Sequence, residues 1–286
     1  PFCAYLKDEA LKLKKIYDAP KTRMFFSGSF EYLMAYRMYF NSAMLRITEM
    51  HRDIPIKVGM SAAMGDWHHL AYRMLEKSDK GFASDVSCFD SSVRKEFLET
   101  VNVIYDIIYA RTSTRHTDIK EAMDIRHGIH RSVEGAHVIF GKGVYKLDQA
   151  MVSGCPGTAV ENSFIMWMLY YLIWKRLAAK HDPKAALYSI FRDSVELAVY
   201  GDDNVCTVKP GFEWFNFNSF QIEAKKLGFV ITDAAKVGGD VPDYLHFSKL
   251  EFLKRSFREE QGWYMGVLDA NSLGKAVAWI RDNKSY

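Results

Sequence analysis

The sequence predicts an α+β fold in which hairpins and helices alternate along the chain. Two pairs of short, alternating apolar runs are each joined by a glycine-containing turn, as in β-hairpins: 136–140 with 144–147, and 195–200 with 205–208. Longer stretches with apolar residues at helical spacing lie between these pairs, and 30–50 is an example. Hairpins interspersed with helices favour α+β over a doubly wound parallel sheet.

The other elements follow from the same periodicities and from turn residues, such as Gly228 at the end of an expected helix. In chain order we expect a basic, aperiodic segment over the first thirty residues, a helix at 30–50, a strand at 82–89, a helix at 93–109, a polar segment without an assigned element at 111–131, the first hairpin, a Ser/Gly/Pro loop at 149–157, a helix at 158–179, the second hairpin, a helix at 216–227, and strands at 229–232, 250–257 and 263–268.

The composition is that of an ordinary globular chain. Its 286 residues are 49% hydrophobic and 26% charged, which is enough material for a large core or two subdomains. The net charge is only +3, so a nucleic-acid surface would have to arise from local clustering of basic residues. The uncharged run at 164–174 is shorter than the roughly 20 residues that span a bilayer, so we interpret it as part of a buried helix.

Cysteine and histidine form no metal-binding pattern in this sequence. The four cysteines are far apart and make no CxxC pair, which argues against a zinc framework and a secreted disulfide scaffold and favours a reducing compartment. His127 and His130 lie three residues apart without a second ligand pair, so we interpret them as a solvated surface pair. Neither HExxH nor a phosphate-binding GxxxxGKS/T motif is present.

Adjacent carboxylates, Asp202 and Asp203, occupy the turn of the second hairpin. Glycine and aspartate are also common turn formers, and average residue usage gives Gly-Asp-Asp by chance in about one chain in twenty of this length. A third acid, Asp85, lies in the strand expected at 82–89, where an unpartnered carboxylate is costly. If Asp85 and Asp202 came within about 4 Å, their repulsion would be on the order of 4 kcal/mol and would favour a bound cation.

Carboxylate oxygens favour Mg²⁺, or Mn²⁺, over zinc. Two such ions about 3.5–4 Å apart can support nucleotidyl transfer. Asp90 lies just beyond the strand that contains Asp85, so it need not have the same role. Together with Ser91 and Ser92, Asp90 could instead be a helix N-cap.

The chain resembles the RNA-dependent RNA polymerases of positive-strand RNA viruses, most closely the picornavirus-like group (Picornavirales), over nearly all of its length. The motifs that carry the resemblance stand in the family's order: Lys7-Asp8-Glu9, Lys14-Lys15 and Lys21-Thr22-Arg23 for motif F, Asp85 and Asp90 for motif A, Ser153-Gly154-Cys155-Pro156-Gly157-Thr158 with Asn162 for motif B, Tyr200-Gly201-Asp202-Asp203 for motif C, Lys236 for motif D, and Phe252-Leu253-Lys254-Arg255 for motif E.

Motif F is one residue longer than the family pattern, so Lys15 is the preferred match and Lys14 the alternative. The resemblance implies that Asp85 and Asp202 bind Mg²⁺ or Mn²⁺, helped by Asp203 and the Val86 carbonyl. The other implied roles are Lys236 as general acid, Asp90, Thr158 and Asn162 on the ribose 2′-OH, Ser153 and Gly154 beside the nascent base pair, Lys15, Lys21 and Arg23 on the triphosphate, and Lys254 and Arg255 on the primer backbone.

The resemblance also implies a right-hand polymerase fold, with an antiparallel palm sheet and its helices, partial fingers, and a largely absent thumb. The expected division is partial fingers with motif F at 1–80, the palm strand and helix of motif A at 81–110, a fingers insertion at 111–150, the palm with motifs B to E at 151–260, and the end of the palm and start of the thumb at 261–286. Because the chain begins at Pro1 and little follows motif E, we expect a fragment that is inactive by itself.

The implied ligands are an RNA template, an RNA primer and nucleoside triphosphates. Relatives also use a protein primer and other viral replication proteins, in membrane-associated complexes of the host cytoplasm, after release from a polyprotein.

Two alternatives stay open. A reverse transcriptase shares the palm and the adjacent aspartates, but usually has a bulky aromatic residue where this chain has Asp90. A non-catalytic RNA-binding domain would use the acids only as turn formers and caps.

Overall fold

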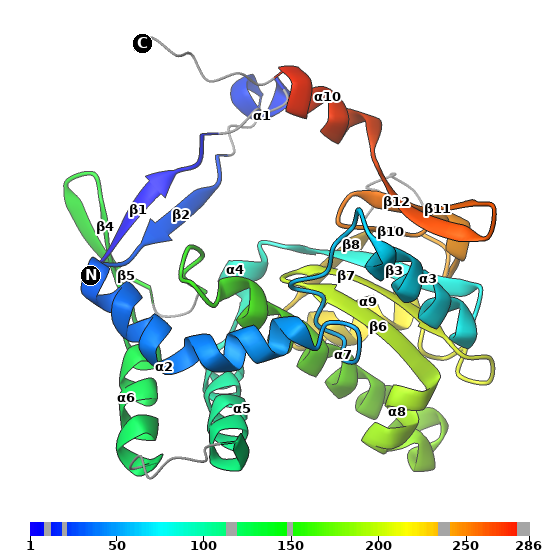
Figure 1. Ribbon diagram of the computed structural model, residues 1–286, viewed down its shortest axis with the longest axis horizontal. Coiled ribbons are helices and arrows are strands. Elements are labelled where there is room, and N and C mark those ends of the chain that lie inside the picture. The colour runs from blue at the N-terminus through cyan, green and yellow to red at the C-terminus, as the bar shows by residue number, and fades with distance from the viewer. Residues whose placement is uncertain (9–12, 19–21, 113–118, 148–150, 234–240, 279–286) are drawn as a thin grey trace.

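The computed structural model describes residues 1–8, 13–18, 22–112, 119–147, 151–233 and 241–278, and it confirms the α+β prediction (Figure 1). The described helices are α1 (Lys14–Tyr17), α2 (Phe30–Glu49), α3 (Gly65–Lys77), α4 (Phe89–Ser92), α5 (Lys95–Thr112), α6 (Ile119–Arg131), α7 (Thr158–His181), α8 (Tyr188–Ser194), α9 (Phe217–Lys226) and α10 (Ala270–Ala278), with short 3₁₀ turns at Pro183–Ala186 and Phe247–Lys249.

The described strands form three sheets. A four-stranded sheet has the order β2-β1-β4-β5, a five-stranded sheet has the order β6-β7-β3-β8 with β9 also paired to β3, and a three-stranded sheet has the order β10-β11-β12. The strands are β1 (Phe2–Leu6), β2 (Met24–Ser27), β3 (Lys80–Ser87), β4 (His137–Phe140), β5 (Gly143–Lys146), β6 (Val195–Tyr200), β7 (Asp203–Val208), β8 (Val230–Asp233), β9 (Leu245–His246), β10 (Glu251–Phe252), β11 (Arg255–Glu260) and β12 (Trp263–Leu268).

The five-stranded sheet, called the central sheet below, is covered by helices on both faces. Side chains alternate between the faces of a strand. Phe82 and Val86 of β3 therefore pack in one core with residues of α7 and α9, whereas Ala83 packs in a second core with Trp67 and Met74 of α3. The same alternation places Asp85 on the face of Ala83, away from α7 and α9.

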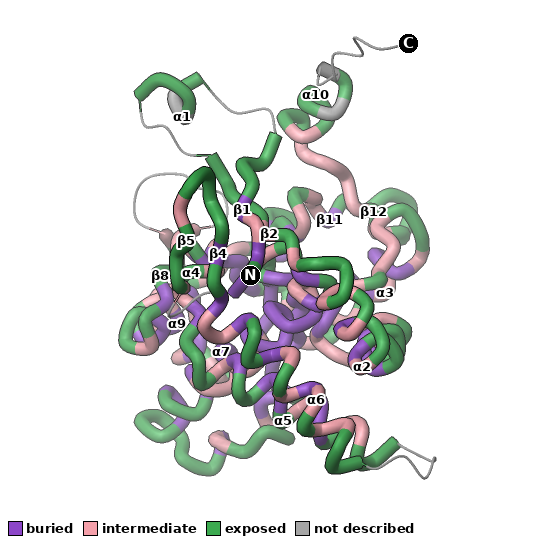
Figure 2. The backbone as a smooth tube through the Cα atoms, turned by 90° about the vertical axis from the view of Figure 1, so that its left-hand side faces the viewer, coloured by how far each residue is buried: buried purple, intermediate pink, exposed green. Residues whose placement is uncertain are grey.

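Helix α7 is the longest element of the central core. Most of its apolar run is buried, as Ile165, Leu169 and Trp174 illustrate, and Figure 2 shows buried residues concentrated along the helix. The helix ends at the cap residue Asp182, and Pro183 follows, a residue that cannot continue a helix. This burial agrees with the interpretation of the run as a core helix. Nowhere in the described residues is there a helix both long and apolar enough to cross a membrane.

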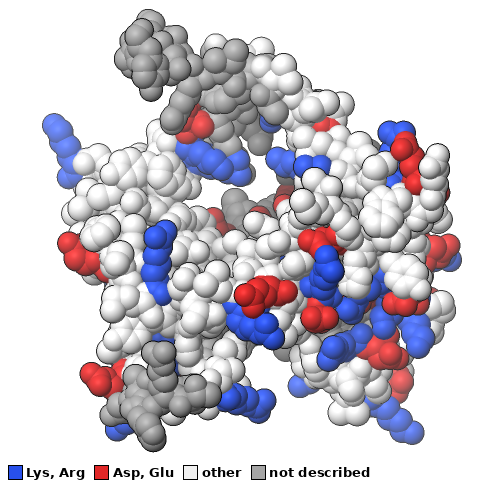
Figure 3. Space-filling view, viewed as in Figure 1, with Lys and Arg blue, Asp and Glu red and all other residues white. Residues whose placement is uncertain are grey.

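The four-stranded sheet stands apart from the central sheet, with α6 on its side of the molecule, while α2 and α5 lie between them and share the core of the central sheet (Figure 1). It has a small core of its own, which includes Phe2, Val138 and Cys155, but most of its residues are exposed (Figure 2). The space-filling view shows a hollow between the two halves, with basic side chains along its upper rim and acidic atoms beside it (Figure 3).

Three expectations about local structure are wrong. The strand expected at 250–257 is two strands, because Leu253 and Lys254 have left-handed φ values of 52° and 58° and form a two-residue turn between β10 and β11. The segment 111–131 contains α6, which buries the polar side chains Arg126 and His130 and therefore lacks an apolar signature. His130 is only 4% exposed, so His127 and His130 are not a solvated pair.

Candidate functional site

The turn with the adjacent carboxylates joins β6 to β7 at one end of the central sheet. Tyr200 pairs with Asp203, which leaves Gly201 and Asp202 as a two-residue loop. Gly201 has a φ of 63° at the first loop position, where hairpin turns of type II′ require glycine. The expected hairpin is therefore present, and the side chains of Asp202 and Asp203 are exposed at its tip.

Asp85 reaches the same end of the sheet through strand register. β3 and β7 are antiparallel and pair Ser84 with Asn204, so the next position, Asp85, lies level with Asp203. The side chain of Asp85 is half-buried, and its backbone carbonyl accepts a hydrogen bond from Thr232 Oγ1 of β8 at 3.2 Å. Val86, the proposed carbonyl ligand, has its side chain in the core and pairs with Ile231.

The pKa of Asp202 depends on its burial and on the charged groups around it. Desolvation by the surrounding protein raises the pKa of its carboxyl above the usual value, although part of the side chain reaches solvent. The carboxylates of Asp90 and Asp85 raise this pKa further, and the guanidinium of Arg23 opposes them. Three acids from β3, α4 and the hairpin thus share one electronegative site, next to a basic residue at the start of β2.

The chemistry of this donor set suits a hard divalent cation, because all three groups are carboxylates. In the part of the chain that the structure describes, no three His, Cys, Asp or Glu side chains are close enough together to enclose a metal ion by themselves. Water or a phosphate would have to complete the coordination of a cation held there, as is usual for Mg²⁺.

A second group of polar side chains surrounds Asp90. Ser153 Oγ donates to Asp90 Oδ2 at 2.5 Å, Asn162 Nδ2 donates to Asp90 Oδ1 at 3.5 Å, and the Met151 N–H donates to the Asp90 carbonyl at 2.9 Å. Asp90 is not an N-cap, since Cys88 occupies that position of α4, with a φ of 52°. The structure therefore brings Asp90 and Asn162 together as expected, and adds Ser153 to them.

Thr158 is not in hydrogen-bond contact with Asp90. Its hydroxyl donates to the Cys155 carbonyl at 2.8 Å and accepts from the Gly154 N–H at 3.4 Å, so it holds the preceding loop instead. That loop also contacts β2, because the Phe26 N–H donates to the Ser153 carbonyl at 2.8 Å. Gly154 has a φ of 124°, and a Cβ there would lie 2.0 Å from the Phe26 carbonyl oxygen. No other residue fits this position.

The basic residues proposed to contact the triphosphate and the primer differ in their surroundings. Arg23 is exposed, and its carbonyl accepts from the Lys7 N–H at 2.8 Å. Lys254 is exposed in the turn between β10 and β11, whereas the Arg255 guanidinium donates to the Gly266 carbonyl at 2.6 Å within the three-stranded sheet. Lys15 belongs to α1, but its side chain, like Lys21 and Lys236, lies outside the described residues.

Sequence reasoning missed the polar residues beneath the turn, here called the hairpin cluster: Ser84, Ser163, Tyr170 and Asn204. The Gly201 N–H donates to Ser163 Oγ at 2.8 Å. Asn204 Nδ2 donates to the Asp202 carbonyl at 2.9 Å, and Tyr170 donates to Asn204 Oδ1 at 2.6 Å. Two signals were available in the sequence: Ser163 directly precedes the apolar run 164–174, and Asn204 directly follows the acids.

A second missed group, here called the seam cluster, lies where α2 and α6 meet α7: Tyr36, His130 and Glu161. Tyr36 Oη donates to Glu161 Oε1, and His130 Nε2 lies 3.3 Å from the same oxygen. Burial opposes ionisation of Glu161, but His130 and Tyr36 outweigh it and hold the pKa of the carboxyl below its usual value.

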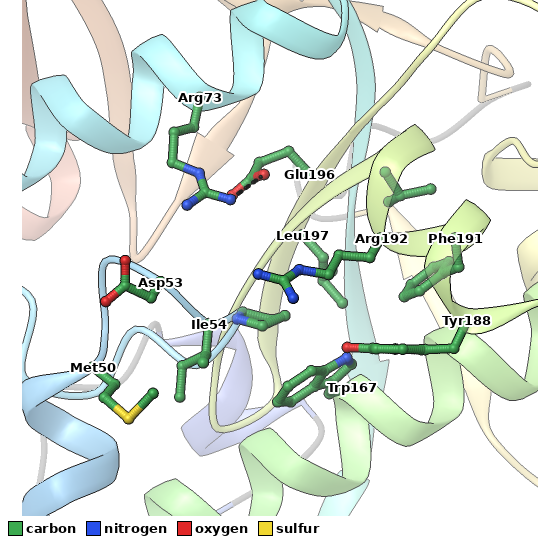
Figure 4. A pocket seen from close by; sticks show the side chains of 12 residues that line it. Met50, Asp53, Ile54, Arg73, Trp167, Tyr188, Phe191, Arg192, Glu196 and Leu197 are labelled. Carbon is green, nitrogen blue, oxygen red and sulfur yellow. Dashed lines mark hydrogen bonds and ion pairs between the residues drawn. The ribbon is translucent and has the colours of Figure 1, made fainter.

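A cavity of about 210 Å³ lies away from the carboxylates, between β6, α7, α8 and the segment after α2 (Figure 4). Its walls include Trp167, Tyr188 and Arg192, and Arg73 pairs with Glu196 at 3.0 Å beside it. The candidate site is therefore the carboxylate end of the central sheet, and not this cavity.

Comparison with solved structures shows which known fold this chain shares. The chain superposes on the Sicinivirus 3Dpol RNA dependent RNA polymerase with a TM-score of 0.79 and 18% sequence identity, over 98% of this chain and 55% of that one. This likeness confirms the right-hand polymerase fold that the motifs implied. It covers only about half of the solved protein.

Sequence comparison agrees. The chain is 30% identical over 263 residues to the replicase polyprotein of acute bee paralysis virus, covering 88% of this chain and 13% of the relative. It is 30% identical over 289 residues to the genome polyprotein of rice tungro spherical virus, covering 97% and 8%. It thus spans a small part of these polyproteins. The family model for viral RNA-dependent RNA polymerase matches residues 2–286. The chain therefore belongs to the viral RNA-dependent RNA polymerases, and to their picornavirus-like group.

Proposed function

We propose that this chain carries the catalytic centre for template-directed RNA synthesis in viral genome replication. The supporting observation is the convergence of Asp202, Asp85, Asp90 and Arg23 at one end of the central sheet. The reaction joins the α-phosphate of a nucleoside triphosphate to the 3′-oxygen of an RNA primer and releases pyrophosphate. Two carboxylates and a nearby guanidinium suit a reaction in which one phosphate group is attacked while another departs.

Asp85 and Asp202 would hold a divalent cation, Mg²⁺ or Mn²⁺, with Asp203 and the Val86 carbonyl as further oxygen donors. The bound cation supplies Lewis-acid stabilisation of the charge that develops on the phosphoryl oxygens. Burial, followed by the nearby Asp90 and Asp85, raises the pKa of Asp202, and this crowding of acids supports the assignment because a bound cation would offset their mutual repulsion. Arg23 would contact the triphosphate with Lys15 and Lys21, and Lys236 would protonate the departing pyrophosphate.

The selection of ribonucleotides would depend on Asp90 and Asn162. Asn162 is 6% exposed, and its Oδ1 atom is buried without a hydrogen-bond partner, while its Nδ2 atom faces Asp90. A ribose 2′-OH could donate to this oxygen, and a deoxyribose would leave it unpaired, at a cost of about 1–3 kcal/mol. Thr158, Ser153 and Gly154 would shape the loop beside the base pair, and Lys254 and Arg255 would contact the primer backbone.

The wider setting is also part of the proposal. The proposed division is fingers at 1–80 and 111–150, a palm at 81–110 and 151–260, and the start of a thumb at 261–286. It would assign the four-stranded sheet and α6 to the fingers and the central sheet to the palm, with α3 of the fingers segment packed on the central sheet and α5 of the palm segment beside α6 (Figure 1). RNA template, RNA primer and nucleoside triphosphates are the ligands. The relatives are polyproteins, which supports release of this chain from a polyprotein, and the host cytoplasm is the proposed location. The proposed partners also include a protein primer and other viral replication proteins, and the proposed setting is a membrane-bound replication complex.

The first experiment uses Asp202→Asn in the polymerase polypeptide that carries this chain with its flanking viral sequence. We expect ribonucleotide incorporation on a primed RNA template with Mg²⁺ to fall by more than about 100-fold, because even the partners of metal ligands typically contribute 10–100-fold. Asp193→Asn is the matched control, since Asp193 is exposed and its carboxylate forms surface ion pairs with Lys77 and Lys209. Undiminished incorporation by Asp202→Asn would refute the metal assignment.

The second experiment measures selection between ribonucleotides and deoxyribonucleotides. We expect Asn162→Ala to lower the ratio of the two kcat/KM values by about 5- to 100-fold, because the buried acceptor for the 2′-OH is lost. Asn218→Ala in α9 is the control, since the Asn218 amide donates to the Val241 carbonyl and to Asp243 Oδ1 and lies on a different helix from Asn162. An unchanged ratio would remove Asn162 from the ribose site.

A further inference from the structure

We propose that Ser163 and Asn204 are positioning residues that fix the backbone of Gly201 and Asp202, and thereby the direction of the Asp202 carboxylate. The inference deepens the proposed function and rests on it, since it concerns the same carboxylate. It is carried by the hydrogen bonds that reach the loop from α7 and from β7.

Ser163 holds the amide side of the loop. Its side chain is fully buried in the second turn of α7, where its hydroxyl donates to the Ala159 carbonyl at 2.6 Å. With its proton committed to Ala159, Ser163 Oγ presents a lone pair to the Gly201 N–H at 2.8 Å. The hydroxyl therefore has a defined orientation, and Gly201 is tied to a helix and not only to its own hairpin.

Asn204 holds the carbonyl side of the loop. Its Nδ2 atom donates to the Asp202 carbonyl at 2.9 Å and to the Ser84 carbonyl at 3.0 Å. Its Oδ1 atom accepts from Ser84 Oγ at 2.8 Å and from Tyr170 Oη at 2.6 Å. Both hydrogens and both lone pairs of the amide are used, and a flipped amide would place its oxygen against two carbonyl oxygens and lose both of those bonds. Asn204 is 3% exposed, so water cannot replace them.

The two contacts restrain the peptide groups on either side of the Asp202 side chain. A free two-residue turn at the end of a hairpin would let a carboxylate sample several directions, and this loop cannot. Ser163 also directly follows Asn162 on α7, so the same helical turn places the ribose-reading side chain and the turn that carries Asp202. Catalytic groups must be held within about 0.5 Å of the productive geometry, and a shared rigid element achieves that.

A purely structural role is the alternative, and the chain offers a matched control for it. Thr207 is on β7, as Asn204 is, and is also fully buried; its hydroxyl donates to the Met74 carbonyl at 2.7 Å on the α3 face, away from the turn. Thr207→Val therefore removes one buried hydroxyl hydrogen bond from the same strand without contacting Gly201 or Asp202.

The test compares Ser163→Ala with Thr207→Val in three measurements. In the chain itself we expect Ser163→Ala to speed hydrogen exchange of the Gly201 amide by about 5- to 100-fold. We expect the Mn²⁺ dissociation constant, from electron paramagnetic resonance of free Mn²⁺, to rise by about 10-fold or more. In the flanked polymerase, kcat should fall by about 10-fold or more, with the KM for nucleotide within about twofold. Thr207→Val should leave all three unchanged.

Asn204→Asp is a second variant, which keeps the shape of the side chain but loses both donors. If it folds, it should also weaken Mn²⁺ binding and lower kcat. Equal effects of Ser163→Ala and Thr207→Val on Mn²⁺ affinity and on kcat would overturn the inference. Absence of RNA synthesis by the wild-type flanked polymerase would instead refute the proposed function, and the exchange and Mn²⁺ measurements would still decide the positioning role.

Discussion

The hairpin cluster and the seam cluster both contact the first two turns of α7, but they are built from different chemistry. The hairpin cluster is neutral: burial, and Cys206 beside it, raise the pKa of Tyr170, so its hydroxyl keeps its proton. The seam cluster contains an ionised carboxylate, Glu161, with His130 stacked on Phe40 at 4.9 Å between ring centroids. The hairpin cluster fixes the conformation of a turn through directional hydrogen bonds. The seam cluster links α2 and α6 to α7 through a charged carboxylate.

The difference shows where each kind of interaction is useful. Neutral hydrogen bonds are directional and depend little on pH, which suits a turn that must present a carboxylate in one direction. A buried carboxylate costs desolvation energy and gives little net stability, but any other arrangement of the helices would leave this charge buried without the groups that satisfy it. We therefore expect Glu161 to specify how α2 and α6 sit against α7, and the hairpin cluster to specify local geometry.

The largest expected effect comes from breaking the seam cluster. Glu161→Ala should lower the free energy of unfolding by about 2–6 kcal/mol, because it leaves the buried Tyr36 Oη and His130 Nε2 facing no acceptor, at about 1–3 kcal/mol for each group. Ser163→Ala should lower it by only about 1–3 kcal/mol, the cost of one unsatisfied buried N–H. Urea unfolding at pH 7, followed by tryptophan fluorescence, measures both.

Glu161→Gln is the control for that comparison, because it keeps an acceptor for Tyr36 and nearly the same volume. It should fall between the other two variants. If Glu161→Ala proves no more destabilising than Ser163→Ala, the distinction between a charged seam and a neutral turn fails.

The two clusters also show which parts of the fold could be predicted from the sequence and which could not. The hairpin, α7 and the strand with Asp85 were predictable, because a period-2 run, a long apolar run and a glycine turn are local signals. α6 was not predictable from its pattern, because what it buries is Arg126 and His130, and their partners Asp106 and Glu161 are 20 or more residues away in sequence. A polar residue is identified as buried only when the tertiary partner that satisfies it is known.

The need to know a residue's tertiary partners also limited the prediction of the candidate site. The resemblance implied a metal site with Asp85 and Asp202 and a ribose site with Asp90 and Asn162, and the structure brings these four residues together at one end of the central sheet. Ser163 and Asn204 were missed although each is adjacent to one of those residues, because their role depends on how α7 crosses the hairpin. Thr158 shows the converse: its motif position suggested the ribose site, but its hydroxyl is committed to the Cys155 carbonyl.

A smaller effect, the pH dependence of stability, tests the comparison without removing either cluster. The pKa of Glu161 lies below its ordinary value of 4.5 in the folded protein, so the folded state binds its proton less readily than the unfolded state does. Its contribution to stability is therefore complete above about pH 4.5 and is lost as the pH falls through the lower, folded-state pKa. The groups that face it are Tyr32 and Tyr36 of α2, Tyr105 of α5, His130 of α6 and Cys155 of the loop before α7.

We therefore expect the difference in unfolding free energy between wild type and Glu161→Gln to be constant from pH 6 to about pH 5 and to shrink at lower pH, by at most about 1.4 kcal/mol per pH unit. The corresponding difference for Ser163→Ala should stay constant throughout, because no group in the hairpin cluster titrates there. Urea unfolding at half-unit steps between pH 3 and pH 6 measures both differences. Parallel curves for all three proteins would show that Glu161 is not held as an ion, and the seam would then be as neutral as the turn.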